Sequence, residues 1–154
     1  MKIKFRRKWM GPKHGVARGV AVFTSEKSVG SDVVVGALGG DGRLRHWSLA
    51  HGVVLNDDTQ SVELLDSHID EWNADPSHHE SVDLGNAVGI YLGNVILKNV
   101  PGSRWRVWPN GHPVIALASG RELDVTALVG DRLMRGGSSL HSIYAQASSD
   151  ETFP

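Results

Sequence analysis

Three glycines spaced four residues apart, Gly85, Gly89 and Gly93, place the strongest constraint on what this chain can fold into. They lie in residues 84–97, which are otherwise rich in Leu, Val and Ile. On a helix they form a ridge without side chains along one face. Each glycine in a helix interior costs about 1 kcal/mol relative to alanine. We therefore expect this ridge to pack closely against another part of the backbone.

The remaining apolar pattern predicts an α+β fold, with helices packed on one face of a small antiparallel β-meander. Apolar residues recur at helical spacing behind candidate capping residues, which are the Asp57-Asp58-Thr59 run, Asp124, and Ser138 or Ser139. Helices are expected at residues 44–50, 59–73, 81–99, 125–134 and 140–147. Two or three strands are expected: 104–108 and 114–118, with 122–123 as the optional third. A Pro-Asn-Gly turn at 109–111 lies inside the hairpin 104–118.

The N-terminal part of the chain is basic and differs from the rest. Seven of the sixteen Lys and Arg side chains lie in the first 18 residues, before any acidic one, and five of them are Lys2, Lys4, Arg6, Arg7 and Lys8. Such a basic arm is compatible with contact to nucleic acid. The alternative is a solvated arm that can fold back on the rest of the chain, which holds all seventeen acidic side chains. We divide the chain into an extension at 1–40, with short strands at 3–5, 20–23 and 33–35, a domain at 41–147 and a tail at 148–154.

Composition excludes several classes of protein. The chain has no cysteine, which removes disulfides, thiol nucleophiles and cysteine-ligated metals. No apolar run is long enough to span a membrane, and no apolar segment follows the basic start as in a secretory signal. We therefore expect a cytoplasmic protein without a membrane span.

Two groups of residues could carry chemistry, but neither has the required pattern. His68 and Glu71, with the His78-His79-Glu80 run, are metal-ligand types, yet no HExxH spacing appears and a solvated loop explains them better. Ser119, His112 and Asp124 can be drawn as a catalytic trio, but no serine lies in a nucleophile elbow. We therefore expect no catalytic residue, metal or cofactor.

The hairpin is the better candidate for a binding surface. Alternation places Trp105 in the core, and Arg104, Arg106 and Trp108 on the opposite face, with His112 beside them. Tryptophan and arginine are the residues most enriched at binding hot spots. Beside the glycine ridge, three polar residues are candidates for lining a small pocket: Asn86, Tyr91 and Asn94.

Three motifs carry a resemblance to a known family. They are the glycine-ridged stretch at 84–96, the Trp-Arg-Val-Trp-Pro-Asn-Gly-His-Pro-Val run at 105–114 and the Ser-Gly-Arg-Glu-Leu-Asp-Val run at 119–125. Together they resemble an uncharacterised actinobacterial family of small proteins, a domain of unknown function. The resemblance covers about residues 43–147, leaves out the basic arm, and implies a fold and a cytoplasmic bacterial setting.

These observations lead to three hypotheses of function. The first is a cytoplasmic binding or accessory protein that acts through a partner protein. The alternative is a small enzyme acting on a metabolite held between the glycine-ridged helix at 81–99 and the hairpin at 104–118. A buried pocket holding acids or histidines with perturbed pKa values would favour the enzyme, and a flat apolar patch with Trp108 would favour the partner. Binding that depends steeply on salt would favour a third option, nucleic-acid contact through the basic arm.

Overall fold

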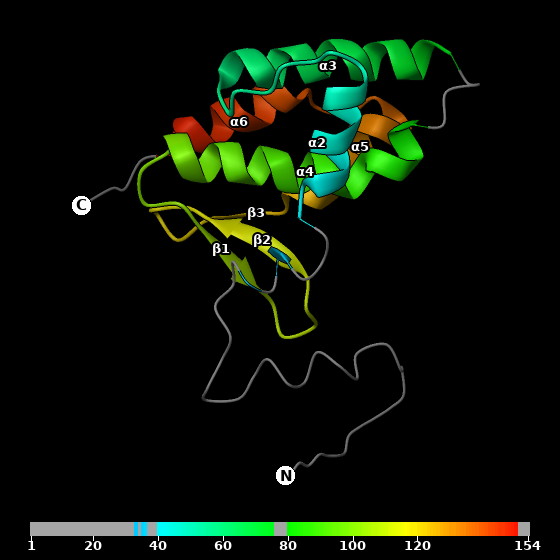
Figure 1. The fold of residues 1–154 in the computed structure, drawn as a ribbon. Coiled ribbons are helices and arrows are strands. Elements are labelled where there is room, and N and C mark those ends of the chain that lie inside the picture. The colour runs from blue at the N-terminus through cyan, green and yellow to red at the C-terminus, as the bar shows by residue number, and fades with distance from the viewer. Residues whose placement is uncertain (1–32, 34, 37–39, 76–79, 151–154) are drawn as a thin grey trace, which may run out of the picture.

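The computed structural model describes residues 33, 35–36, 40–75 and 80–150, and the side chains of 80–83 are not described. Within these ranges the order is α2 (Gly42–Ala50), α3 (Thr59–Ala74), α4 (Glu80–Asn99), β1 (Arg104–Val107), β2 (Pro113–Ala116), β3 (Glu122–Leu123), α5 (Val125–Arg135) and α6 (Leu140–Ser148). The helices lie on one side of a three-stranded antiparallel sheet, which confirms the predicted α+β fold (Figure 1).

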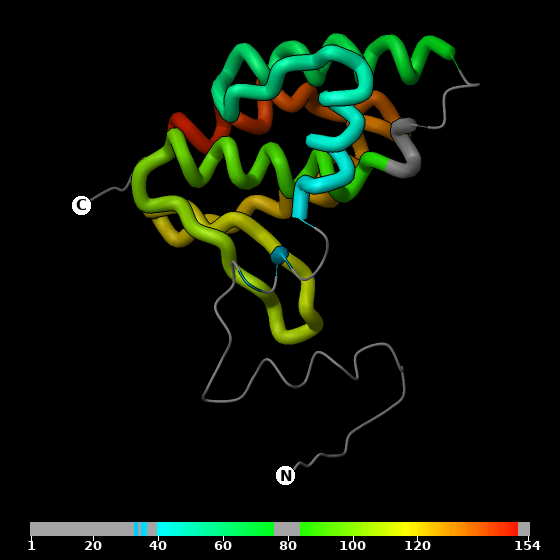
Figure 2. The backbone as a smooth tube through the Cα atoms, viewed as in Figure 1, coloured from blue at the N-terminus to red at the C-terminus, as the bar shows by residue number. Residues whose placement is uncertain are grey.

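Helix α4 is the centre of the molecule. It contacts α2, α3, α5, α6 and β1, and in Figure 2 it runs between the sheet and the outer helix α3. Its own residues Leu92, Val95 and Ile96 are completely buried. A helix surrounded in this way must bury several faces, which explains why its apolar residues are not confined to one stripe.

The glycine ridge of α4 meets a different neighbour at each position. A Cβ on Gly89 would lie 2.9 Å from the Cα of Thr126 at the start of α5, so backbone does pack on this glycine as predicted. A Cβ on Gly93 would overlap the indole of Trp105, and one on Gly85 would touch only the Leu133 side chain at 3.4 Å. The prediction of backbone contact is therefore wrong for Gly85 and Gly93, because side chains fill the space there.

The three strands form the predicted meander in the order β1-β2-β3. Trp105 pairs with Ile115 across β1 and β2, and Ile115 pairs with Leu123 across β2 and β3. All three side chains belong to the main hydrophobic core. The inward face of the sheet is thus apolar, and Trp105 takes the core position that alternation predicts.

Asn94 on α4 connects the helix to β1 and to the residue that precedes α2. Its Oδ1 accepts a hydrogen bond from Trp105 Nε1 at 2.9 Å, and its Nδ2 donates to Asp41 Oδ2 at 3.3 Å. The indole N–H is therefore satisfied inside the core, as a buried polar group requires.

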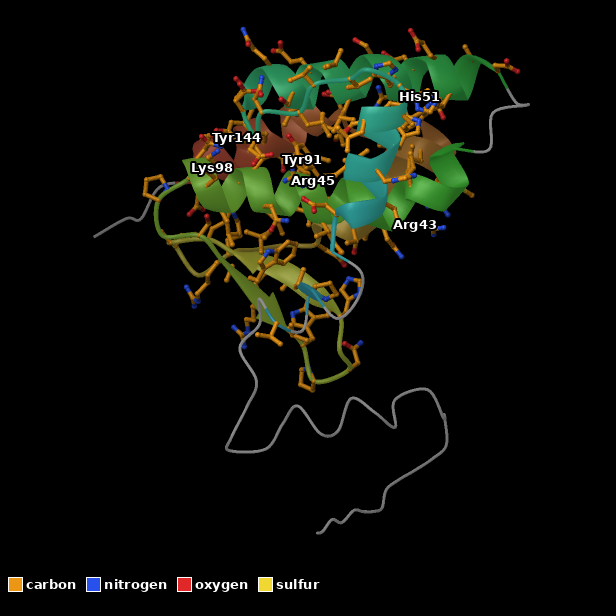
Figure 3. All side chains as sticks on the ribbon, in the orientation of Figure 1. Arg43, Arg45, His51, Tyr91, Lys98 and Tyr144 are labelled. Atoms are coloured by element: carbon orange, nitrogen blue, oxygen red, sulfur yellow. The ribbon has the colours of Figure 1, made fainter. Side chains whose placement is uncertain are left out.

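The connection between α2 and α3 is anchored on Tyr91 of α4, which is almost completely buried. The Asp57 backbone N–H donates to the Tyr91 hydroxyl at 3.0 Å, and Arg45 lies over the Tyr91 ring at 5.3 Å and pairs with the Asp57 carboxylate at 3.2 Å (Figure 3). These contacts hold Asp57 at a φ of 60°, a conformation that is uncommon outside glycine.

Asp66 joins three helices. This α3 residue accepts hydrogen bonds from the Leu140 and His141 backbone N–H groups at 2.8 and 3.0 Å, at the start of α6. Arg132 of α5 lies 3.5 Å from the same carboxylate and 2.6 Å from Asp70. The free N–H groups at the start of α6 are thus satisfied by a neighbouring helix as well as by the Ser139 cap.

Of the strands predicted in the N-terminal extension, only the one at 33–35 falls on described residues. Val33, Val35 and Gly36 are helical, so the predicted strand at 33–35 is wrong. Val35 is buried in the main core. Its packing there outweighs the general preference of valine for strands, which depends strongly on context. The expected strands at 3–5 and 20–23 and the basic arm lie outside the described residues.

Candidate functional site

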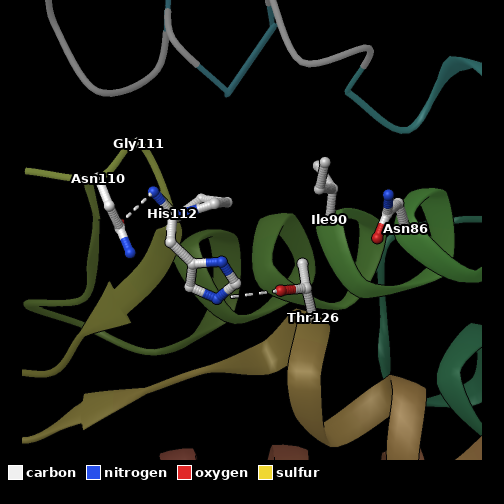
Figure 4. Close-up of a pocket in the computed structure, with 7 residues that line it drawn as sticks. Asn86, Ile90, Asn110, Gly111, His112 and Thr126 are labelled. Atoms are coloured by element: carbon white, nitrogen blue, oxygen red, sulfur yellow. Dashed lines mark hydrogen bonds between the residues drawn. The ribbon is translucent and has the colours of Figure 1, made fainter. Parts of the chain in front are cut away.

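A pocket opens where α4, the β1–β2 turn and the first turn of α5 meet (Figure 4). Its volume is about 350 Å³, near the lower end of the range typical of small-molecule sites. Polar and apolar groups both contribute to its wall, which is made by Asn86, Ile90, Asn110, Gly111, His112, Pro113 and Thr126.

The close contact at Gly89 brings α5 to this pocket. Because Gly89 has no side chain, Thr126 can approach α4 at backbone distance. Asn86 and Ile90, which flank this contact on α4, then face the pocket together with Thr126. The sequence feature that most constrains the fold therefore also brings α5 to the site.

The tight turn between β1 and β2 positions His112. Gly111 has a φ of 88° and donates its backbone N–H to the Trp108 carbonyl at 2.8 Å. The Asn110 Oδ1 accepts from the His112 backbone N–H at 3.0 Å, and the Trp108 N–H donates to the His112 carbonyl at 2.9 Å. These bonds fix the backbone from which the imidazole projects toward α5 (Figure 4).

His112 and Asp124 form a close pair, with His112 Nε2 2.8 Å from Asp124 Oδ1. The same oxygen accepts from the Thr126 hydroxyl at 3.2 Å and from the Ala127 backbone N–H at 3.1 Å, which caps α5. Because an ionised carboxylate only accepts, Nε2 must carry the proton in this pair. The other ring nitrogen, Nδ1, has no hydrogen-bond partner among the described residues.

Trp108 supports His112 from the other side. The two rings lie 5.4 Å apart with an interplanar angle of 37°. The Trp108 Nε1 donates to Glu122 at 3.0 Å, and Arg106 pairs with the other oxygen of Glu122 at 3.1 Å. Trp108 and Arg106 are therefore tied to β3, whereas Arg104 is exposed and has no ion-pair partner among the described residues.

The structure separates the three residues predicted to line a pocket. Asn86 lines the pocket described above. Asn94 lines a second hollow, beside Asp41 and Trp105. Tyr91 is buried and outside the pocket that Asn86 lines, and burial raises the pKa of its hydroxyl above the ordinary value.

Ser119 does not join His112 and Asp124. Its hydroxyl and backbone N–H both donate to the Asp150 carboxylate, at 2.7 and 3.1 Å. These hydrogen bonds lower the pKa of Asp150, and the bond from the Ser119 hydroxyl has the largest effect. Of the trio Ser119, His112 and Asp124, only His112 and Asp124 meet, and the hydroxyl near them is that of Thr126. Asp150, which was expected in the tail at 148–154, is bound to Ser119 between β2 and β3.

His68 belongs to an aromatic cluster between α2 and α3. Its ring lies edge-on to Trp47 at 5.2 Å, and its Nδ1 is 3.4 Å from Glu71. Within the described ranges, no group of three or more acidic or histidine side chains is arranged to hold a metal ion. His78 and His79 lie outside those ranges, and the side chain of Glu80 is not described.

Comparison with known proteins gives one finding. The chain matches a family of unknown function, DUF6278, over residues 1–150. The chain belongs to this family. The DUF6278 match begins at residue 1, so the resemblance limited to 43–147 is too narrow and the basic arm is included. No curated protein and no solved structure shows significant similarity to the chain.

Of the residues that line this pocket, Asn86 was predicted as a pocket residue and His112 as part of the hairpin's binding surface. Thr126, Ile90 and Asn110 were not predicted at the site. The only sequence signal for Thr126 was its place two residues after the cap Asp124.

Among the described residues, no helix has the length and apolar character that crossing a membrane requires.

Proposed function

We propose that this DUF6278 protein binds a small polar molecule in the pocket between α4, the β1–β2 turn and α5. The observation that carries the proposal is the His112 ring, which Asp124 fixes through Nε2 while Nδ1 has no partner. A histidine anchored on a carboxylate beside a concave site is a common feature of ligand-binding and catalytic centres. The pocket also lies where the metabolite-binding alternative puts it, between the glycine-ridged helix and the hairpin.

The same pair gives the site a route to acid–base chemistry. An imidazole whose Nε2–H donates to a carboxylate can accept a proton at Nδ1, and the carboxylate then stabilises the imidazolium. We therefore keep the enzyme hypothesis as a branch of this proposal, with His112 as the proton acceptor.

The test is a small-molecule screen read by backbone amide NMR. Binders should shift the amide signals of Asn86, Gly111 and Thr126, and the His112→Gln variant should lose these shifts. The matched control is His141→Gln. His141 is an exposed histidine on α6 that pairs with Glu63 of α3 and does not line the pocket. Hits that shift other regions only, or that persist in His112→Gln, would contradict the proposal.

Partner-protein binding through the hairpin is the second candidate, and one observation favours it. Arg104 projects from β1 without an ion-pair partner among the described residues, and the neighbouring Arg106 side chain is 59% exposed. Crosslinking in native extract should then place a partner on β1, and Arg104→Glu should abolish that crosslink while leaving the melting temperature unchanged. Crosslinks confined to the helical side would contradict this candidate.

The remaining expectations about setting stay proposals. A cytoplasmic location is supported by the cysteine-free sequence, which suits a reducing compartment, and cell fractionation tests it. An actinobacterial setting rests on the resemblance alone. Nucleic-acid contact through the basic arm predicts binding that weakens steeply with added salt.

A further inference from the structure

We infer that the pocket takes a small neutral or cationic ligand that presents N–H or O–H donors, and that it disfavours anions. This inference rests on the proposed function, because it names the ligand class of the same site. Four observations carry it, from the tautomer of His112 to the charges around the pocket.

The first observation concerns the hydrogen-bonding capacity of His112. Its Nε2 is committed as a donor to Asp124 at 2.8 Å. In the neutral imidazole the other nitrogen then carries a lone pair and no proton. The free Nδ1 is therefore an acceptor, and the group that matches it is an N–H or O–H of the ligand.

The second observation is the unused capacity of Asp124. The three hydrogen bonds that its side chain accepts from described residues, His112, Thr126 and Ala127, all reach the same oxygen, Oδ1. The second oxygen has no hydrogen-bond partner among the described residues, and the Asp124 side chain is 30% exposed. With a neutral imidazole, the pair carries one negative charge at the edge of the pocket.

The third observation is that the helix terminus at the site is already occupied. The N-terminus of a helix attracts anions through its free N–H groups and its dipole. At α5, however, the Asp124 carboxylate accepts from the Ala127 N–H. A ligand anion would have to lie beside this carboxylate and would be repelled by it.

The fourth observation is that, within the described ranges, no cation compensates this charge. None of the described residues that line the pocket is Lys or Arg. Arg106 of the hairpin is bound to Glu122. The other wall groups are the Asn86 and Asn110 amides and the apolar side chains of Ile90 and Pro113, which suit a small ligand with one flat apolar part and one polar end.

The experiment uses three probes with the same number of non-hydrogen atoms: benzamidine, benzamide and benzoate. They are a cationic donor, a neutral donor and acceptor, and an anionic acceptor. Titration of the full chain at about pH 8.5, where imidazole side chains are mostly neutral, is followed by the amide signals of Asn86, Gly111 and Thr126. Fragments of this size bind in roughly the millimolar range.

We expect benzamidine to bind about tenfold or more tightly than benzoate, as one nearby negative charge in a partly exposed site requires. Benzamide should lie between them. In the Asp124→Asn variant this preference should fall to about threefold or less, because asparagine keeps the helix cap but not the charge. Circular dichroism confirms that the variant is folded.

The outcomes separate this inference from the proposed function. Benzoate binding as tightly as benzamidine, or a preference unchanged in Asp124→Asn, would overturn the ligand class while leaving a working pocket. Absence of binding by both donor probes would also overturn the inference. The proposed function would then still be judged by the wider screen, in which anionic hits that depend on His112 would preserve it.

Discussion

Replacing Gly89 by alanine tests whether the glycine ridge exists for close packing. The new Cβ would lie 2.9 Å from the Cα of Thr126 and 3.1 Å from its Cγ2. A backbone atom cannot rotate away, so α4 and α5 must separate locally. Gly85→Ala is the matched control, because it lies on the same ridge and its Cβ would meet only the flexible end of Leu133 at 3.4 Å.

The magnitude follows from two opposed effects. Alanine in place of glycine stabilises a helix interior by about 1 kcal/mol, and this gain is common to both variants. Overpacking of a filled interface costs about 1–3 kcal/mol and applies only to Gly89. We therefore expect Gly85→Ala to raise the free energy of unfolding by up to about 1 kcal/mol, and Gly89→Ala to lie about 1–3 kcal/mol below it.

Urea denaturation followed by circular dichroism measures both variants. The comparison between them removes the helix-propensity term, so the result reports the steric effect directly. If the two free energies of unfolding agree within about 0.3 kcal/mol, the size of an ordinary surface effect, the close approach of α5 to Gly89 is not what requires glycine there.

Three further predictions concern residues outside the ridge. Trp105→Ala should destabilise the fold by about 3–5 kcal/mol as a core aromatic, and Trp108→Ala by only about 1–2 kcal/mol, since it is half-buried and loses one hydrogen bond; equal losses in calorimetry would place Trp108 in the core. The backbone N–H of Ser61 donates a hydrogen bond to Asp58 and lowers the pKa of its carboxyl group. This cap should therefore stabilise the protein above the unfolded-state pKa of Asp58, and the stabilisation should be lost as the pH falls through the folded-state pKa. In melts recorded at a series of pH values, Asp58→Asn should lack this loss of stability at acid pH. Asp66→Ala should cost roughly 2 kcal/mol or more in urea, because it leaves polar groups of two helices unpaired, whereas the exposed partner Asp70 should cost less than about 1 kcal/mol when replaced by alanine.

The elements of the domain could be predicted from local sequence signals. Asp58, Asp124 and Ser139 each accept the hydrogen bond expected of a helix cap, from Ser61, Ala127 and Ser142 respectively. The hairpin followed from the Asn-Gly turn and the alternation around Trp105. These signals act over a few residues, so the sequence displays them directly.

The pairing of polar groups could not be predicted in the same way. Two members of the trio drawn from the sequence, His112 and Asp124, do meet across twelve residues, but nothing in their spacing required it. The third member, Ser119, meets Asp150 across thirty-one residues instead. Both pairs depend on how β3 and the two last helices return to the hairpin. Trp108 was expected on the binding face of the hairpin, but its hydrogen bond to Glu122, which the meander brings within reach of the indole, was not expected. Alternation fixes the face of a side chain but not its neighbours on that face.

The junction at Asp66 has a consequence for how the molecule opens. The first N–H groups of α6 donate to a carboxylate on α3, 74 and 75 residues earlier in the chain. Movement of α3 away from the domain therefore exposes these amides at the same time, although they belong to a different helix. In native-state hydrogen exchange, the amides of Leu140 and His141 should follow the protection of α3 rather than fray with the C-terminus. The last helix and the second helix of the described domain would then unfold as one cooperative unit.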